Sequence, residues 1–213
     1  LPRVRTLFDQ ELDTLAISTV RGLALDMPRI ADSGHSGTAL SLAPLGWLLY
    51  SRILHHSPEH PDWPNRDRLV LSNGHACVLL YALLHLCGYR LTLQDLKEFR
   101  KPFSQTPGHP ETWVTPGIDC STGPLGQGFA HAVGYAVAES HLVKRFGDEL
   151  VDHYTYVLCS DGDMMEGATA EASSLAGHLK LGKLIAFYDD NRVTIDGPAS
   201  QSFSEDVAAR YQA

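Results

Sequence analysis

Residues 154–197 read YTYVLCSDGDMMEGATAEASSLAGHLKLGKLIAFYDDNRVTIDG, and this stretch decides the fold. Two runs rich in apolar and β-branched residues, 154–159 and 184–188, predict β-strands, and the segment between them predicts a helix. A helical crossover returns the chain to the same edge of a sheet, which makes the two strands parallel neighbours. The sequence therefore predicts an α/β unit whose strands deliver residues 161–162 and 189–191 to one edge.

The residues that follow these two strands carry oxygen ligands. Asp161 follows the first strand, and Asn191 follows the second. Ligands of open α/β sheets bind beyond the carboxyl ends of the strands, so both side chains can aim at one point. A carboxylate and an amide oxygen suit Mg²⁺ or Ca²⁺, and phosphate oxygens commonly complete the shell of Mg²⁺. A calcium EF-hand loop is excluded, because Glu166 stands where that loop needs glycine and Ala172 where it needs glutamate.

The alternation of predicted helices and strands extends over the rest of the chain. It indicates an α/β fold, a doubly wound and mainly parallel sheet with helices on both faces. One more strand is expected at 68–72, and a long irregular segment at 101–124 is of the kind that usually carries function. The expected helices span 7–30, 40–54, 76–87, 92–100, 125–146 and 204–211, with Thr92 and Ser204 as N-caps and Gly182 near the end of the helix between the last two strands.

Size and charge limit the class of protein. The 213 residues are one domain by the usual prior. The formal net charge of −8 argues against a nucleic-acid or anionic-membrane partner. No secretory signal and no bilayer-spanning apolar run is visible. The cysteines at 77, 87, 120 and 159 have unpatterned spacings, which favours reduced buried thiols over disulfides. We therefore expect a cytoplasmic globular protein.

Three histidines, His35, His75 and His109, each stand beside glycine in a separate turn. One loop histidine is most often only solvated, but the repeated Gly–His context favours a place at a site. The histidines of 55–60 form a denser cluster, which reads as a surface loop because no cysteine or carboxylate pattern completes a zinc site. Residues 177–183, GHLKLGK, approach a P-loop, but Leu184 replaces its Ser or Thr and the segment precedes a strand.

The motifs together resemble those of one family. Thiamine diphosphate enzymes carry GDG followed by Asn at the next strand end, and the chain has SDG at 160–162 and Asn191. The whole stretch 160–197 is similar to transketolases, and the similarity continues through SGHSG (33–37), LSNGHA (71–76), TPGHPE (106–111) and STGPLGQG (121–128), in family order. Ser160 and Ser36 depart from the family's usual Gly and Pro, and neither departure removes a donor or ligand.

The resemblance implies a divalent metal, Mg²⁺ or Ca²⁺, and thiamine diphosphate as cofactors. Asp161, Asn191 and the main-chain oxygen of Val193 would bind the metal. The N–H of Gly162 would face the diphosphate, because glycine lets the backbone approach an anion and a helix N-terminus follows. The turn at 123–126 would contact the aminopyrimidine through its backbone. The residues expected to bind the cofactor are Gly123, Leu125, Asp161, Gly162, Glu166 and Asn191.

The resemblance also implies the catalytic residues. His35, His75 and His109 would line the substrate channel, bind donor hydroxyls and help to move protons. Glu166 and Glu171 would belong to an acidic network between the two active sites of a dimer. By the residues alone, these glutamates could equally be solvated charges on a helix.

The implied activity is that of a transketolase of the pentose phosphate pathway, which transfers a two-carbon ketol group from a ketose phosphate to an aldose phosphate. Residues 1–213 resemble only the diphosphate-binding domain, slightly shortened, without the pyrimidine-binding and C-terminal domains. A glutamate of the partner's pyrimidine domain activates the cofactor in the family, so we expect activity only with a second chain, in a homodimer or heteromer. A split transketolase for another sugar, a dihydroxyacetone synthase and a non-catalytic interaction module remain as alternatives.

Overall fold

A three-stranded parallel sheet forms the centre of the protein, in a computed structural model that describes residues 9–212. The strands β1 (Arg68–Leu71), β2 (Thr155–Ser160) and β3 (Leu184–Asp189) lie side by side in that order. Val70 pairs with Val157, and Val157 pairs with Ala186. The expected α/β fold, a parallel sheet with helices on both faces, is confirmed.

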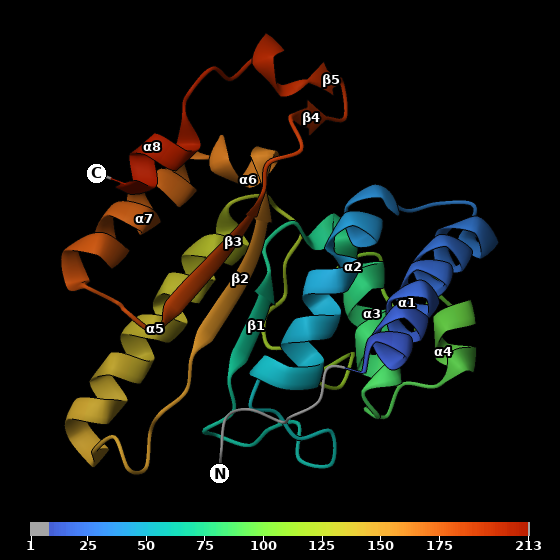
Figure 1. Cartoon of the computed structure of the whole chain (residues 1–213), viewed down its shortest axis with the longest axis horizontal. Coiled ribbons are helices and arrows are strands. Elements are labelled where there is room, and N and C mark those ends of the chain that lie inside the picture. The colour runs from blue at the N-terminus through green and yellow to red at the C-terminus, as the bar shows by residue number, and fades with distance from the viewer. Residues whose placement is uncertain (1–8, 213) are drawn as a thin grey trace.

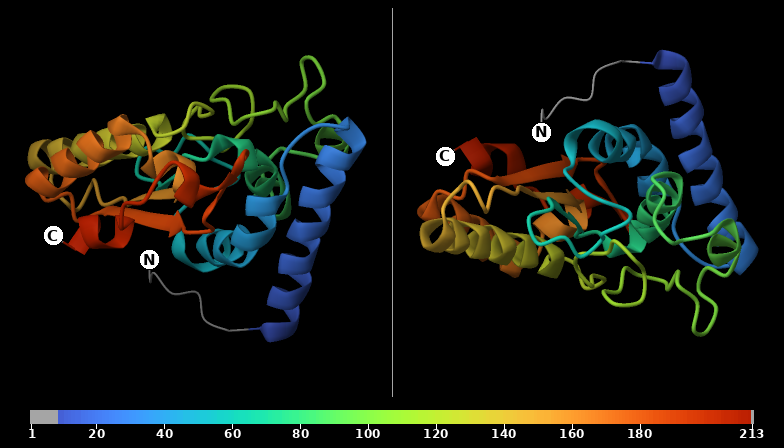
Figure 2. Two further views of the ribbon diagram at one scale, coloured as in Figure 1. Left: turned by 90° about the horizontal axis from the view of Figure 1, so that it is seen from above. Right: turned by 90° about the horizontal axis from the view of Figure 1, so that it is seen from below.

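Helices lie on both sides of the sheet (Figures 1 and 2). One side carries α1 (Gln10–Ala31), α2 (Gly37–Leu48) with a π-helical extension (Leu49–Ile53), α3 (Cys77–Leu86) and α4 (Leu93–Lys97). The other side carries α5 (Gln127–Phe146), α7 (Gly167–Leu179) and α8 (Val207–Gln212). Short elements complete the chain: 3₁₀ turns at Gly74–Ala76 and Ala199–Gln201, α6 (Asp161–Met164), and the hairpin of β4 (Val193–Thr194) and β5 (Gly197–Pro198).

The period-2 alternation of strand side chains divides the core into two clusters. Leu71 and Leu158 belong to the cluster under α1, α2 and α3, whereas Val70 and Val157 belong to the cluster with α5. All six residues of β2 are buried. A strand that is covered on both faces favours apolar residues on both of them, which explains the continuous apolar run at 156–159 in the middle of β2.

The helix boundaries differ from the sequence predictions in the N-terminal half. The first helix was expected from residue 7, which lies outside the described residues, and within them it begins at Gln10 after Asp9, whose Oδ1 accepts the N–H of Leu12 at 3.0 Å. The second helix begins at Gly37 instead of residue 40, and the N–H of Leu54 bonds the carbonyl of Leu49 in a wider, π-type turn. Thr92 caps α4 as predicted.

The predicted start of α8 is wrong, whereas the predicted end of α7 near Gly182 is close to the observed one. The N-cap of α8 is Asp206 and not Ser204, because the helix begins at Val207 and Asp206 Oδ1 accepts the N–H of Ala209 at 3.0 Å. The helix α7 ends at Leu179, before Gly182, and Lys180 takes the left-handed conformation with φ 56°. All four cysteines have free thiols, and Cys77, Cys120 and Cys159 are buried as predicted, whereas Cys87 is partly exposed.

Candidate functional site at the carboxyl edge of the sheet

The ends of β2 and β3 bring Asp161 and Asn191 together, although they are 30 positions apart. Ser160 and Asp189 are register partners at the last rung of the sheet. Asp161 is 4% exposed, and its Oδ2 accepts the N–H groups of Asn191 at 3.1 Å and Arg192 at 2.8 Å. The carboxylate of Asp161 therefore fixes the backbone of the loop that follows β3 by two hydrogen bonds.

A tyrosine holds the second oxygen of the same carboxylate. The hydroxyl of Tyr188, the penultimate residue of β3, donates to Asp161 Oδ1 at 2.6 Å. Burial, and then this hydrogen bond to Asp161, raises the pKa of Tyr188, so the phenol keeps its proton. A carboxylate offers about four acceptor positions. Within residues 9–212 three of them have a hydrogen-bond partner, and the remaining one is on Oδ1.

The Asn191 side chain closes a turn in its own loop. Its Oδ1 accepts the N–H of Val193 at 3.0 Å, and its Nδ2 donates to Asp189 Oδ2 at 3.1 Å. The contact between Asp161 and Asn191 thus runs through main-chain atoms. Oδ1 of Asn191 retains a lone pair, and Val193 lies exposed in β4. These are hard oxygen donors of the kind that Mg²⁺ and Ca²⁺ require.

Gly162 meets the predicted cofactor turn directly. A Cβ atom at Gly162 would stand 2.7 Å from Cδ1 of Leu125, so any larger residue here would displace the end of that leucine side chain. The two loops are therefore in direct contact at this point. Glu166 is exposed, and its Cβ packs against Gly126 of the same turn. The predicted residues Leu125, Gly162 and Glu166 thus lie together.

The three predicted histidines converge from separate loops. The rings of His35 and His75 lie 5.2 Å apart in an edge-to-face arrangement. The ring of His109 lies 3.4 Å from where a Cβ of Gly123 would stand, and Gly74, next to His75, packs against the backbone of the same turn. Three Gly–His turns that are distant in sequence therefore line one region.

Burial and mutual repulsion keep two of these histidines neutral. Burial first, and then the charge that His35 would carry, lowers the pKa of His75, while Asp163 opposes the change. Burial, Arg100 and His35 lower the pKa of His109. Near neutral pH each of these two rings has one N–H donor and one nitrogen acceptor.

Two further side chains hold the histidine loops in place. The hydroxyl of Tyr81, from α3, donates to the carbonyls of Pro107 at 2.8 Å and His109 at 3.1 Å. The guanidinium of Arg100 donates to Ser33, two residues before His35. The loops that carry His35 and His109 are thereby anchored to the helical layer.

Buried polar atoms near the histidines fit a polar ligand. The side-chain amide of Asn73 is fully buried, and neither its oxygen nor its nitrogen has a hydrogen-bond partner within residues 9–212. The hydroxyl of Thr122, next to Gly123, is in the same state. Unpartnered buried polar groups cost about 1–3 kcal/mol each, which water or a ligand can offset. The residues present therefore fit both a hard cation and a polar cofactor.

Asp163 is a central residue that the sequence reasoning missed. Its carboxylate is fully buried and accepts from the Ser72 hydroxyl at 2.6 Å, the Gly126 N–H at 2.8 Å and the Ser160 N–H at 3.0 Å. The available signal was the Ser-x-x-Asp spacing at 160–163, which is a capping-box pattern. Tyr188 was also missed, because its role depends on a contact with Asp161.

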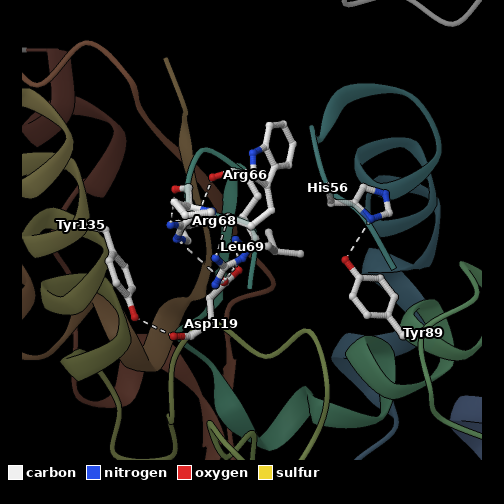
Figure 3. A network of polar contacts seen from close by, with 9 residues as sticks. His56, Arg66, Arg68, Leu69, Tyr89, Asp119 and Tyr135 are labelled. Atoms are coloured by element: carbon white, nitrogen blue, oxygen red, sulfur yellow. Dashed lines mark hydrogen bonds and ion pairs between the residues drawn. The ribbon is translucent and has the colours of Figure 1, made fainter. Parts of the chain in front are cut away.

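An open cavity of about 1440 Å³ lies apart from these residues. The loops 57–64 and 112–121 line it, together with Arg66 and Arg68 at the start of β1. Figure 3 shows that both arginines reach toward Asp119, and Arg66 Nη2 lies 2.6 Å from its Oδ1. Burial raises the pKa of Asp119, and the two guanidinium groups oppose that rise. The cavity contains none of the predicted site residues.

The rejected zinc cluster has a structural explanation. Both ring nitrogens of His56 are engaged, Nδ1 with the Tyr89 hydroxyl at 2.9 Å and Nε2 with the Tyr50 carbonyl at 2.8 Å (Figure 3 shows the Tyr89 contact). In the described part of the chain no group of three or more His, Cys, Asp or Glu residues could hold a metal ion. Nor does any described helix combine the length and apolarity that crossing a bilayer requires.

The chain resembles known proteins over nearly its full length. Residues 12–213 match the family model of the transketolase thiamine diphosphate binding domain. The transketolase of Geobacillus stearothermophilus is 53% identical over 205 residues, which cover 95% of this chain and 31% of the relative. Transketolase 1 of Saccharomyces cerevisiae is 55% identical over 206 residues, which cover 95% of this chain and 30% of the relative.

Solved structures agree with the sequence relatives. The crystal structure of Campylobacter jejuni transketolase superimposes with a TM-score of 0.92 at 48% identity, over 97% of this chain and 32% of that one. A Pichia stipitis transketolase in complex with sedoheptulose-7-phosphate gives a TM-score of 0.90 at 51% identity, over 94% of this chain and 30% of that one.

A parallel α/β domain that gathers a carboxylate, glycine turns and histidines beyond its strand ends is typical of cofactor-binding enzymes. This chain belongs to the transketolase family and corresponds to its thiamine diphosphate binding domain. It spans less than a third of the length of the Geobacillus relative, 31%.

Proposed function

We propose that the chain forms the diphosphate and metal half-site of a transketolase that transfers a two-carbon ketol group from a ketose phosphate to an aldose phosphate. One observation carries the proposal. Asp161 is buried at the end of β2 and held by three hydrogen bonds beside the Asn191 turn, in a chain of this family. A carboxylate held in this way is pre-organised for a cation.

The metal and the diphosphate would be held by residues of three loops. Asp161 Oδ1, Asn191 Oδ1 and the main-chain oxygen of Val193 supply oxygen ligands, and Mg²⁺ is favoured over Ca²⁺ where phosphate oxygens complete the shell. The backbone of Gly162 can approach the diphosphate, and the Gly123–Leu125 turn offers main-chain groups to the aminopyrimidine. Thiamine diphosphate, when bound, supplies the nucleophilic carbon that the protein side chains lack.

The histidines would serve the sugar substrates. Neutral His75 and His109 can each donate one hydrogen bond and accept another, which suits substrate hydroxyl groups. His35, at the exposed end of the group, completes the set. Such rings can take a proton from a hydroxyl as a carbonyl forms and return it in the reverse step. Sugar phosphates as substrates are supported by the Pichia stipitis complex with sedoheptulose-7-phosphate.

A second chain completes the proposed active site. The relatives are about three times longer than this chain, which leaves room in them for a pyrimidine-binding domain. We infer that such a domain, in a homodimer or heteromer, supplies the acid that activates the cofactor, with Glu166 and Glu171 near the shared boundary. We also propose a reducing compartment such as the cytoplasm, which the free thiols support, and a role in the pentose phosphate pathway, which would follow from sugar phosphate substrates.

Isothermal titration calorimetry tests the half-site. The chain is titrated with thiamine diphosphate in Mg²⁺ or in EDTA, with and without a partner fragment that carries the pyrimidine domain of a relative. Asp161→Asn should abolish the Mg²⁺-dependent binding. Asp196→Asn, a change at an exposed aspartate of the neighbouring hairpin, should leave it intact. Binding that is equal in both variants would contradict the assignment.

A turnover assay tests the need for a partner. The chain alone should show no ketol transfer between xylulose 5-phosphate and ribose 5-phosphate, and the partner fragment should restore it. Turnover by the purified chain alone would refute the shared site. Absence of cofactor binding under every condition would favour a non-catalytic module.

A further inference from the structure

Asp163 joins three segments that are far apart in the sequence. Its Oδ1 accepts from the Ser72 hydroxyl, 91 positions away, and from the Gly126 N–H, 37 positions away. Its Oδ2 accepts the N–H of Ser160, at the end of β2. These partners precede His75, end the Gly123–Gly126 turn and precede Asp161. One carboxylate therefore contacts three of the loops that carry the proposed cofactor and substrate groups: the loop of His75, the Gly123–Gly126 turn and the loop of Asp161. It does not contact the loops of His35, His109 and Asn191.

We propose that Asp163 is a positioning residue, whose carboxylate fixes the His75 loop, the Gly123–Gly126 turn and the Asp161–Gly162 loop relative to one another. The inference rests on the proposed function, because it concerns the same half-site. Asp163 itself is fully buried and is assigned no contact with cofactor, metal or substrate. It acts only through the loops that it joins.

The direction of the hydrogen bonds shows why a carboxylate is needed. The Ser72 oxygen accepts the N–H of Phe129 at 2.9 Å, so its own proton must point to Asp163. All three close partners of Asp163 are consequently donors, and an acceptor is required at both oxygens. An asparagine side chain in the same place would point its N–H₂ donor either at the N–H of Ser160 or at the donors of Ser72 and Gly126, so two donors would face each other. Asparagine is therefore a shape-matched replacement that breaks the pattern.

The partners of Asp163 are neutral, since no lysine or arginine within residues 9–212 forms an ion pair with it. Its charge is balanced by oriented N–H and O–H groups. The negative charge of Asp163 also acts on His75. It raises the pKa of His75, whereas burial, His35 and His109 lower it. Loss of the charge should therefore move the His75 titration as well as the loops.

The test compares Asp163→Asn with Asp67→Asn. Asp67 is a matched control because it is also a buried aspartate that joins two segments, accepting the N–H groups of Tyr154 at 2.6 Å and His55 at 2.8 Å. It precedes β1, at the opposite edge of the sheet. Each variant is examined by calorimetry with Mg²⁺ and thiamine diphosphate, by NMR titration of the His75 ring, and by urea unfolding.

Asp163→Asn should weaken cofactor binding by about tenfold or more, as loss of supporting hydrogen bonds does at metal sites, and should move the His75 titration midpoint to lower pH. Asp67→Asn should lower the urea midpoint but leave the cofactor affinity and the His75 midpoint at the wild-type values. A folded Asp163→Asn protein with wild-type affinity and an unchanged His75 midpoint would overturn the proposal.

Two further measurements keep the outcome decisive. If Asp163→Asn does not fold, Ser72→Ala removes one of the three links and keeps the charge; a several-fold loss of cofactor affinity supports the proposal, and wild-type affinity overturns it. If the wild-type chain binds no cofactor even with a partner fragment, the proposed function fails. The His75 midpoint of the unliganded variants then still decides whether Asp163 controls this loop.

Discussion

The hydroxyl of Tyr188 lies within hydrogen-bond reach of a buried carboxylate, and that single contact can be tested. Tyr188→Phe removes the donor to Asp161 Oδ1 and leaves the ring in place. We expect the free energy of unfolding to fall by about 1.5 kcal/mol, since hydrogen bonds to charged groups contribute about 1.5–3 kcal/mol when buried and Tyr188 is partly exposed. Urea denaturation measures the change.

The same variant should also bind Mg²⁺ less tightly, because Asp161 loses one of the contacts that orient it. Tyr135→Phe is the control: this hydroxyl donates to the Asp119 carbonyl at 2.6 Å (Figure 3), and both residues line the separate cavity, which contains none of the predicted site residues. It should lower stability without affecting Mg²⁺ binding. Equal Mg²⁺ affinity in Tyr188→Phe and wild type would show that the tyrosine does not orient the carboxylate.

Single residues were predictable from the sequence where a motif marked them. Asp161 and Asn191 follow neighbouring strands, so their approach could be expected, whereas the shared Gly–His context of His35, His75 and His109 only favoured a site and the family resemblance implied their convergence. Asp163 and Ser72 carry no such mark. Their contact joins positions 91 apart, and the parallel pairing of β1 with β2 brings them together, since Leu71 pairs with Leu158 and the N–H of Ser72 bonds the Leu158 carbonyl at 2.8 Å. Sequence patterns do not specify such contacts.

At the scale of elements, the start of α5 packs against β1 without room for a side chain. A Cβ at Gly128 would stand 2.5 Å from the Cα of Ser72. Gly128→Ala should therefore push the helix from the strand and lower the free energy of unfolding by about 1–3 kcal/mol, the usual effect of overpacking. Urea denaturation and the loss of thiamine diphosphate affinity provide the measurements.

Gly134 offers a matched substitution in the same helix. It is exposed, and a Cβ there would meet nothing within 4 Å. Gly134→Ala should stabilise the protein by about 0.5–1 kcal/mol, because alanine is the better helix former. Destabilisation of similar size at both positions would mean that close approach to β1 is not the cause.

The sequence predicted which segments form strands and helices better than it predicted the residues at which the helices begin and end. The three strands begin within one residue of the expected positions, because buried parallel strands read as short apolar runs. The caps were less predictable. Ser204 and Asp206 are both good N-cap residues, and the choice between them depends on where the chain returns to the core through Val207. Lys180 adopts a left-handed turn although Gly182 stands nearby.

At the scale of the whole molecule, a buried histidine makes stability depend on pH. Burial first, then the nearby charges of Arg68, Lys183 and Arg66, lowers the pKa of His153 from 6.5 to about 4. Between these values the unfolded chain binds a proton that the folded chain does not. Stability from this group is therefore complete above pH 6.5 and falls as the pH drops toward 4.

His153→Gln should flatten this dependence. The urea midpoint of the wild type should fall between pH 7 and pH 4.5 by more than that of the variant, while His75 and His109 contribute equally to both proteins. Identical pH profiles would show that His153 titrates normally in the folded state.

β3 is one of the two edge strands of the sheet, and its exposure to solvent has a practical consequence for the isolated chain. β1 is buried, whereas the residues of β3 are partly or fully exposed, and within residues 9–212 no strand pairs with its outer side. An open row of backbone donors and acceptors is a template for another strand, so concentrated samples are expected to self-associate and aggregate. Dilute solutions, or a lysine in place of the exposed Ala186, would preserve the monodisperse material that titrations require.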